Sequence, residues 1–235
     1  MGPLKGLKIL EFSGIGPGPF CGMVLADLGA EVIRLDKSST HGNLNKADIH
    51  NRNKKSITVN LKDPESIKEV KKLISQMDAI FEGFRPGVME RLGLGPSECL
   101  KINKSLVYGR MTGWGQEGPM AHQSGHDINY IALSGVLDSM GREGENPQPP
   151  LNLVGDFGGG GMLLAVGMLG AIIHSQKTGE GQVVDAAMID GSSLLMSMFY
   201  SFKEMGFWTE NKESNLLDGA AHFYDTYVCL SLIHI

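Results

Sequence analysis

The sequence has little cysteine and no excess of basic charge. Its 235 residues include three cysteines, Cys21, Cys99 and Cys229, whose spacing fits neither a disulfide framework nor a zinc site. We therefore expect a reducing compartment and no metal centre. The 26 acidic residues outnumber the 21 basic ones, and the formal charge of −5 gives no general attraction to nucleic acid or anionic lipid.

Long hydrophobic runs and targeting segments are also missing. Residues 1–12 show neither the basic-then-apolar pattern of a secretory signal nor the composition of a transit peptide. The longest apolar stretch, residues 157–173, is short for a membrane span and carries four consecutive glycines, which favours a buried helix. With 42% apolar and 20% charged residues, the chain can bury a real core, which excludes general disorder.

Strand-like and helix-like segments alternate through the first 110 residues. A strand, a loop of glycine and proline, a helix and a second strand follow one another in about 35 residues, which is typical of a βαβ unit with parallel strands. We expect strands at 7–12, 31–35, 56–61, 79–82 and 106–110, and helices at 20–28, from Asp63 onward and at 96–102. The pattern predicts an α/β domain with a mostly parallel sheet and a ligand crevice at the carboxyl ends of its strands.

Beyond Met111 the composition changes. Loops of glycine, proline and polar residues cover 112–125 and 141–150, and loops of this length are commonly functional. The remaining segments predict helices at 128–137, 159–175 and 191–203, with one more strand at 182–185.

The first glycine loop imitates a dinucleotide-binding motif incompletely. Gly14 and Gly16 follow the first strand, and Asp36 stands where such a motif places the acid that holds a ribose. Pro17 and Pro19, however, remove two of the amides that would cradle a pyrophosphate. An NAD-dependent oxidoreductase is therefore a minority hypothesis.

Several stretches in order resemble the class III CoA-transferase (CaiB/BaiF) superfamily, and within it the α-methylacyl-CoA racemases. The general blocks are 16–21, 23–30, 51–56 and 84–92, and the blocks typical of the racemase branch are 125–130, 150–156 and 218–219. The resemblance implies a Rossmann-like large domain over residues 1–225, and it implies that two protomers interlock as a homodimer. Residues 226–235 form a divergent tail where the small domain would begin, so we expect a C-terminally truncated chain from which the small domain is largely missing.

The resemblance also implies where the CoA part of the substrate binds, with no separate cofactor. The matching positions are Lys37, Val59, Asn60, Leu61, Lys62, Gly83, Arg85, Arg91, Gly125, Asp127, Ile128, Asn129 and Tyr130. Lys37 departs from the arginine usual in the family, which keeps the charge but loses the bidentate fork. On composition alone, Lys37 is a solvated surface charge, and Arg85 and Arg91 are exposed helix charges.

His126 and Asp156 match the family's catalytic positions. Inverting a carbon beside a thioester needs one group that removes the α-proton and another that returns a proton on the opposite face, a division that suits histidine and aspartate. The resemblance assigns part of the stabilisation of the enolate oxygen to the backbone amide of Asp127. Without the surrounding motifs, His126 would be an ordinary surface histidine and Asp156 a helix N-cap.

The sequence therefore predicts an isomerase that racemises 2-methyl-branched acyl-CoA thioesters in fatty acid, lipid or bile acid metabolism. One alternative is a class III acyl-CoA transferase with Asp156 as nucleophile, although His126 stands where transferases carry an aromatic residue. A second alternative is an inactive CoA-binding fragment. We expect a soluble intracellular protein, in a peroxisome or mitochondrion if eukaryotic and otherwise in the cytoplasm, without a membrane span or nucleic-acid partner.

Overall fold

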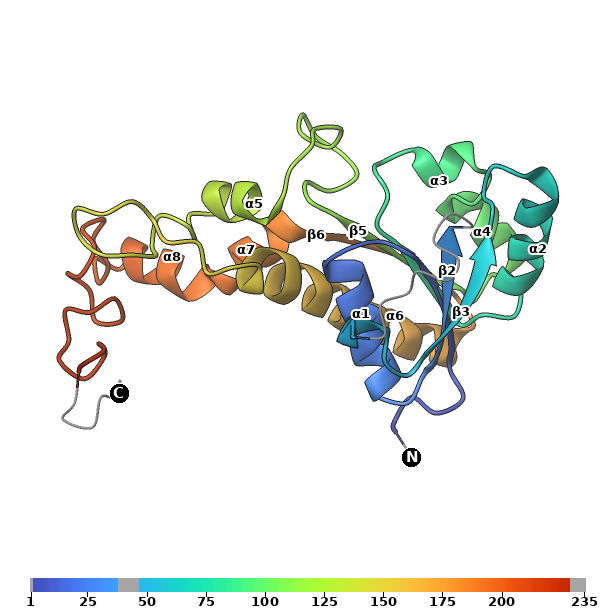
Figure 1. The fold of residues 1–235 in the computed structure, drawn as a ribbon, viewed down its shortest axis with the longest axis horizontal. Coiled ribbons are helices and arrows are strands. Elements are labelled where there is room, and N and C mark those ends of the chain that lie inside the picture. Colours follow the sequence, from blue (N-terminus) through green and yellow to red (C-terminus); the bar gives the residue numbers. More distant parts are fainter. Residues whose placement is uncertain (1, 38–46, 229–235) are drawn as a thin grey trace.

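Six parallel strands form one sheet in the part of the chain that the computed structural model describes, residues 2–37 and 47–228 (Figure 1). The sheet order is β3-β2-β1-β4-β5-β6, and every neighbouring pair is parallel. The strands are β1 (Lys8–Phe12), β2 (Glu31–Lys37), β3 (Lys54–Val59), β4 (Ala79–Glu82), β5 (Val107–Thr112) and β6 (Val183–Ala187). The order reverses beside β1, which creates the switch point where open α/β sheets bind ligands.

Helices cover both faces of this sheet. On one face, α1 (Pro17–Asp27) and α6 (Leu163–Thr178) bury apolar side chains against β1, β2, β4 and β5. On the other face, α2 (Pro64–Ile74), α3 (Val88–Arg91) and α4 (Pro96–Ile102) enclose a second core. Successive strand residues alternate between these two cores: Ile9 belongs to the first and Leu10 to the second.

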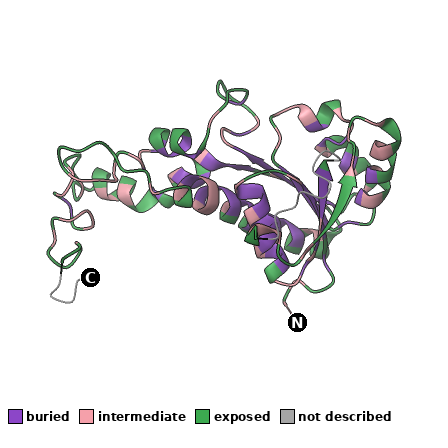
Figure 2. Cartoon of the chain, in the orientation of Figure 1, coloured by how far each residue is buried: buried purple, intermediate pink, exposed green. Residues whose placement is uncertain are grey.

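The remaining elements lead away from the sheet. They are η2 (Ile49–Asn51), α5 (Asp127–Leu133), the π-helix η3 (Leu153–Met162), α7 (Met188–Leu195) and α8 (Ser197–Glu204). We call residues 134–152 and 196–228 the arm, because they project from the sheet domain (Figure 1). Figure 2 shows that buried residues concentrate on the sheet and its helices, whereas the arm is largely exposed, and α8 has no fully buried residue.

The predicted α/β alternation and parallel sheet are confirmed. Asp63 caps α2 as expected, since its Oδ2 accepts a hydrogen bond from the Ser66 amide at 3.1 Å. The expected helix at 20–28 begins earlier, at Pro17, because a proline has no amide to leave unpaired in a first helical turn. The expected strand at 56–61 instead runs from Lys54 to Val59, since residues 60–62 turn into α2.

Three predicted helices have different bounds. The helix expected at 128–137 covers Asp127–Leu133, and the one expected at 191–203 is divided at Met196 into α7 and α8. The helix expected at 159–175 begins at Leu153 as a π-helix and continues as α6. The five glycines of η3 carry no side chains that would hold the backbone to α-helical spacing.

The continuous helical stretch Leu153–Thr178 is, by length and composition, apolar enough to cross a membrane. Much of it is buried against other elements: Leu164, Met168 and Ile172 belong to the core beneath the sheet. This packing confirms the predicted core helix. The boundary predicted at residue 225 stays a prediction, and residues 229–235, with Cys229, lie outside the described part of the chain.

Candidate functional site

A hollow lies at the carboxyl ends of β1, β2, β3 and β4, where the sheet order predicts a ligand crevice. Its lining comes from the ends of these four strands and the segments that follow them: Phe12, Ser13, Leu35, Asp36, Lys37, Val59, Leu61 and Phe84. Three of the predicted CoA contacts, Lys37, Val59 and Leu61, therefore come together although 22 residues separate the first two in the sequence. Asn60 and Lys62 complete the turn from β3 to α2, where the Asn60 Oδ1 accepts a hydrogen bond from the Lys62 amide at 3.1 Å.

Asp36 cannot serve as a free ribose acceptor. It is buried, and its Oδ2 accepts hydrogen bonds from the Nε and Nη2 of Arg34, each at 3.0 Å, and from the Ser56 hydroxyl at 2.5 Å. A carboxylate oxygen shared by three donors is already satisfied by the protein. The resemblance to a dinucleotide motif thus ends at the glycines, and Asp36 holds β2 and β3 together instead.

The first turn of α1 is tied to the sheet by a buried ion pair. The Lys54 Nζ lies 2.6 Å from the Glu11 Oε2 and donates to the Pro19 carbonyl at 2.8 Å, and both charged side chains are almost fully buried. Burial raises the pKa of Glu11 to about 7, and the charge of Lys54 opposes that rise. This pair positions the N-terminus of α1, where Gly16 precedes the helix.

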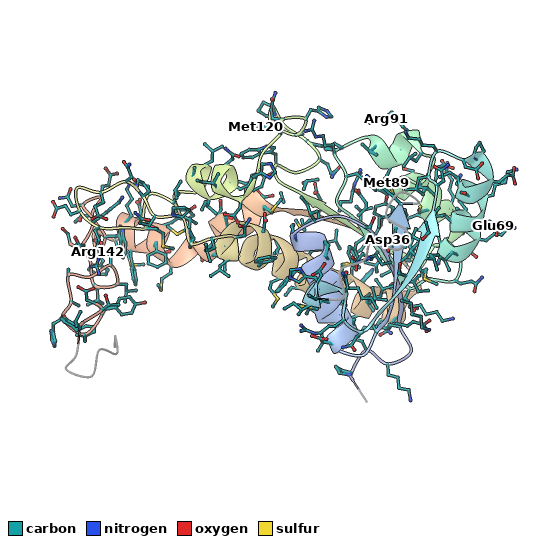
Figure 3. The ribbon with its side chains drawn as sticks, viewed as in Figure 1. Asp36, Glu69, Met89, Arg91, Met120 and Arg142 are labelled. Atoms are coloured by element: carbon teal, nitrogen blue, oxygen red, sulfur yellow. The ribbon has the colours of Figure 1, made fainter. Side chains whose placement is uncertain are left out.

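The segment after β4 carries three further predicted contacts, Gly83, Arg85 and Arg91, all exposed at the same edge of the sheet. Arg91 is on α3, along the upper edge of the domain in Figure 3. Arg85 lies close enough to Tyr130 to lower the pKa of its hydroxyl, although burial and the nearby Asp156 carboxylate raise that pKa to about 12. Arg85 therefore lies near Tyr130, in the second half of the site.

That second half begins at His126, the N-cap of α5. The His126 amide donates to the Asn129 Oδ1 at 2.9 Å, and the Asn129 amide donates to the His126 carbonyl at 2.8 Å. These reciprocal bonds fix the start of the helix. Tyr130 is buried against Trp114, with ring centroids 4.7 Å apart, while Ile128 remains about half exposed.

Gly125, another predicted contact, gives Tyr130 its space. A Cβ at Gly125 would lie 2.8 Å from the Tyr130 ring, so any larger residue would displace that ring. The buried Tyr130 ring therefore forms part of the wall of the site.

Asp156 lies inside the first turns of η3, so the N-cap interpretation is wrong. The helix begins at Leu153 with Asn152 as its N-cap, and the Asn152 side-chain amide donates to the Asp156 Oδ2 at 2.8 Å. A Cβ placed on Gly16 would be 3.2 Å from the same oxygen. The Asp156 carboxylate thus lies directly over the N-terminus of α1.

The carboxylate of Asp127 connects the two halves, a role that the sequence analysis did not assign. Asp127 is 5% exposed, and its Oδ2 accepts a hydrogen bond from the Asp156 amide at 2.6 Å. The pKa of Asp127 is raised above its ordinary value, chiefly by burial. The bond from the Asp156 amide opposes this rise, and the Asp156 charge adds to it. A Cβ on Gly155 would lie 2.4 Å from the Asp127 Oδ2, so this approach needs a glycine.

The segments that carry the predicted catalytic residues are therefore joined through one intermediate side chain. His126 precedes Asp127 in the chain, and Asp127 binds the backbone of Asp156, 29 residues further on. Of the predicted CoA contacts, Lys37 and residues 59–62 group at the adjacent strand ends, whereas residues 125–130 lie at the start of α5. Within residues 2–37 and 47–228, no cluster of three His, Cys, Asp or Glu side chains could hold a metal ion.

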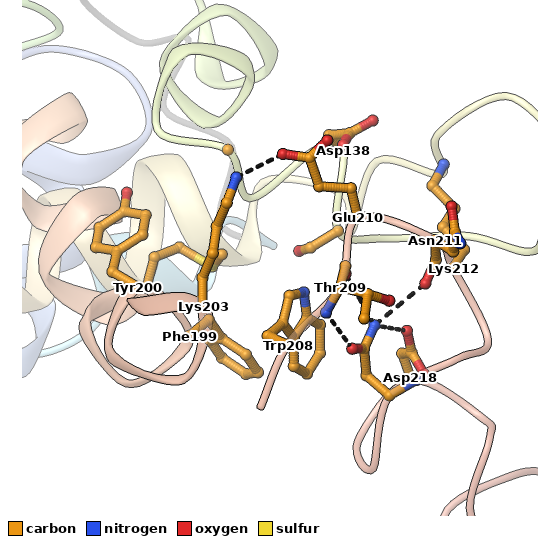
Figure 4. A pocket seen from close by; sticks show the side chains of 14 residues that line it. Asp138, Phe199, Tyr200, Lys203, Trp208, Thr209, Glu210, Asn211, Lys212 and Asp218 are labelled. Carbon is orange, nitrogen blue, oxygen red and sulfur yellow. Dashed lines mark hydrogen bonds and ion pairs between the residues drawn. The ribbon is translucent and has the colours of Figure 1, made fainter. Parts of the chain in front are cut away.

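A separate cavity lies on the arm (Figure 4). Phe199 and Trp208 form part of its lining, with ring centroids 5.0 Å apart, and the Lys203 ammonium pairs with Glu210 at 2.6 Å. None of the predicted catalytic or CoA-contacting residues lines this cavity. It is thus distinct from the candidate site.

Residues 4–231 match CoA-transferase family III. Over 95% of its length, the chain is 45% identical to the mouse protein named alpha-methylacyl-CoA racemase and 44% identical to the human one. A crystal structure of a CAIB/BAIF family protein from Brucella suis superposes with a TM-score of 0.79 at 28% identity, covering 87% of this chain and 58% of that one. The chain spans 58% of the length of the mouse and human relatives.

Proposed function

The chain belongs to CoA-transferase family III, and from this membership we propose that it carries the CoA-binding and proton-transfer groups of a racemase for 2-methyl-branched acyl-CoA thioesters. The mouse and human relatives, 45% and 44% identical, bear the name of that activity. The observation that carries the proposal is the linkage of His126 to Asp156 through the Asp127 carboxylate. A proton-transfer pair must be held at a set separation, and this hydrogen bond ties the backbone that carries Asp156 to the helix that begins after His126.

The proposed reaction moves one proton off the α-carbon and another onto it. One member of the pair, as a base, removes the α-proton, and the thioester becomes an enolate. The other member, already protonated, then delivers a proton to the opposite face. His126 and Asp156 exchange these roles with the enantiomer, so in either direction one of them starts as the base and the other starts protonated.

The enolate oxygen needs hydrogen-bond donors where its charge develops. The Asp127 amide begins α5, and the first amides of a helix have no partner within the helix. We assign this amide to the enolate oxygen, because a fixed dipole stabilises charge without reorganising during the reaction. Asp127 would then act twice, through its amide on the substrate and through its carboxylate on Asp156.

The CoA moiety is assigned to the crevice at the strand ends. Lys37, Arg85 and Arg91 provide the positive charge that a 3′-phosphate and a pyrophosphate require. Residues 59–62 supply the turn beside them, and the thioester then points towards His126 and Asp156. Membership in fatty acid or bile acid metabolism and the cellular compartment stay predictions.

A direct test follows the α-proton in heavy water. One enantiomer of a 2-methylacyl-CoA is incubated with the protein, and deuterium at the α-carbon and the configuration of that carbon are followed by mass spectrometry and NMR. We expect deuterium uptake with epimerisation in the unmodified chain and loss of epimerisation in His126→Ala and Asp156→Asn. Uptake that persists in both variants would contradict the assignment.

The transferase alternative makes a different prediction. There the Asp156 carboxylate would attack the thioester carbonyl, the C–S bond would break, CoA thiolate would leave, and a mixed anhydride would remain on Asp156. Hydroxylamine would trap this acyl group as a hydroxamate and release Asp156 unchanged. An inactive CoA-binding fragment would bind the ester with full affinity after His126→Ala and exchange no α-proton.

A further inference from the structure

The segment from Gly83 to Arg91 carries three of the proposed CoA contacts, yet those three residues are exposed. Its backbone includes Gly87 in the left-handed region, with φ of 80°. Exposed arginines lose conformational freedom when they bind phosphates, so their affinity depends on how well the backbone beneath them is held. The structure shows what holds this backbone.

Arg110, on β5, contacts a residue at each end of this segment. Its Nε lies 3.1 Å from the Glu82 Oε1 at the end of β4, and its Nη1 lies 2.9 Å from the Glu90 Oε1 on α3. The Arg110 side chain is only 9% exposed, and the Glu82 side chain only 1%. One buried guanidinium thus bridges two carboxylates that lie immediately before the segment and near its end.

Glu82 extends this contact into the segment itself. Its second oxygen, Oε2, accepts a hydrogen bond from the Phe84 amide at 2.7 Å, beside Arg85. Glu82 and Arg110 face each other in the register of β4 and β5. The bridge therefore depends on strand pairing and fixes the first turn of the exposed segment relative to the sheet.

We propose that Arg110 is a positioning residue for CoA binding, which holds Gly83, Arg85 and Arg91 in the geometry that the phosphates require by bridging Glu82 and Glu90. Arg110 does not touch the substrate in this arrangement. Its effect is on the affinity for the CoA moiety, and the proton-transfer groups lie elsewhere. The inference rests on the proposed function, because that function places CoA on this segment.

The test measures binding and chemistry separately on the full chain. Titration calorimetry with a 2-methylacyl-CoA ester gives the affinity, and deuterium uptake at saturating ester gives the rate of the chemical step. For Arg110→Met we expect the Kd to rise about tenfold, the scale of one charge-assisted hydrogen bond, with little change in the saturated rate. Arg110→Lys restores part of the affinity, since lysine keeps the charge but reaches the carboxylates with a single ammonium.

Arg142→Met is the matched control. Arg142 also bridges two carboxylates, those of Glu213 and Asp225, at 2.6 and 2.7 Å, but it lies on the arm. We expect the Kd of this variant to equal that of the unmodified chain. Glu90→Gln guards against a folding defect in Arg110→Met, because Glu90 is half exposed and its loss frees only the α3 end of the bridge.

The outcomes separate the two proposals. Unchanged Kd in both Arg110→Met and Glu90→Gln would overturn the positioning role and leave the proposed function standing. An equal loss of affinity in Arg142→Met, or a saturated rate that falls as far as the affinity, would also overturn it, because the effect would then be general. Failure of the unmodified chain to bind the ester would overturn the proposed function and the inference with it.

Discussion

Asp127 follows His126 at the start of α5, and its carboxylate accepts a hydrogen bond from the Asp156 amide of η3. Replacing it with alanine leaves the Asp156 amide without its acceptor and frees η3 to shift from α5. We expect Asp127→Ala to slow epimerisation about a hundredfold, the cost of a small misplacement of reacting groups. Proton exchange without inversion, through His126 alone, should decrease less.

Asp127→Asn is the control for this prediction. Its side-chain oxygen can still accept the Asp156 amide, so most of the epimerisation rate should return. The measurement is the ratio of epimerisation to deuterium uptake in both variants. A ratio that is equal in Asp127→Ala and the unmodified chain would show that the hydrogen bond does not hold the pair in place.

Glu82 gives the stability of the fold a pH dependence. Burial raises its pKa from 4.5 to about 7, while the Phe84 amide and Arg110 lower it; Glu90 and Tyr108 also face this cluster. The folded state thus binds this proton more tightly than the unfolded state does. The resulting stabilisation is complete below pH 4.5 and is lost as the pH rises through 7.

Glu82→Gln tests this dependence. The variant cannot titrate at this position, so its free energy of unfolding should decline less between pH 4.5 and 7 than that of the unmodified chain. Glu11 contributes in the same direction in both proteins, since burial also raises its pKa to about 7, and it cancels in the comparison. Urea unfolding across this pH range is the measurement. Parallel pH profiles would refute the assignment to Glu82.

At the scale of elements, glycines allow η3 to pack against α7 with backbone touching backbone. A Cβ on Gly191 would lie 1.8 Å from the Gly159 carbonyl oxygen, and one on Gly159 would lie 2.7 Å from the Ser192 amide nitrogen. This approach is closer than any side chain permits. It sets the position of η3, and with it the position of Asp156.

Gly191→Ala should therefore destabilise the protein by about 1–3 kcal/mol, the usual cost of overpacking, and should also slow epimerisation. Gly170→Ala is the matched control, because Gly170 is exposed on α6 and an added Cβ there meets nothing within 4 Å. We expect that control to gain about 0.5–1 kcal/mol from helix propensity. Denaturant unfolding of both variants is the check; equal stabilities would contradict the packing argument.

At the scale of the whole molecule, the arm and the adjoining helices expose large apolar side chains that the sheet domain does not cover. Among them are Leu194, Leu195, Met198, Phe207 and Phe223, which are 61%, 51%, 45%, 70% and 66% exposed. Exposed apolar surface of this extent favours association. It is the physical reason to retain the predicted homodimer as a hypothesis.

Phe207→Lys is the corresponding test. A charge at this exposed position should weaken self-association by about tenfold or more without lowering the melting temperature of the sheet domain, from which it is remote. Sedimentation velocity over a range of protein concentrations measures the association. If the unmodified chain sediments as a monomer at every concentration, the homodimer prediction is contradicted. If the variant associates as strongly as the unmodified chain, Phe207 is not part of the contact between the two protomers.

Local features of the sequence were sufficient for the order of elements and for the family. These features act over only a few residues, so they can be recognised in the sequence itself. They are the Asp63-Pro64 start of α2, the alternating strands and the glycine loop. The motifs at 125–130 and 150–156 identified His126 and Asp156 as a pair. The rule for parallel strands predicted the crevice, and the family resemblance placed Lys37, Val59 and Leu61 among the residues that contact CoA.

Tertiary structure alone decided how those residues are held. The bond from Asp156 to the Asp127 carboxylate and the bridge from Arg110 to Glu82 and Glu90 join residues far apart in the chain, and they arise from strand order and register. The π-helical start of η3 likewise depends on glycine contacts with α1 and α7. Local pattern specifies which segments form, whereas contacts between segments depend on packing that no single segment encodes.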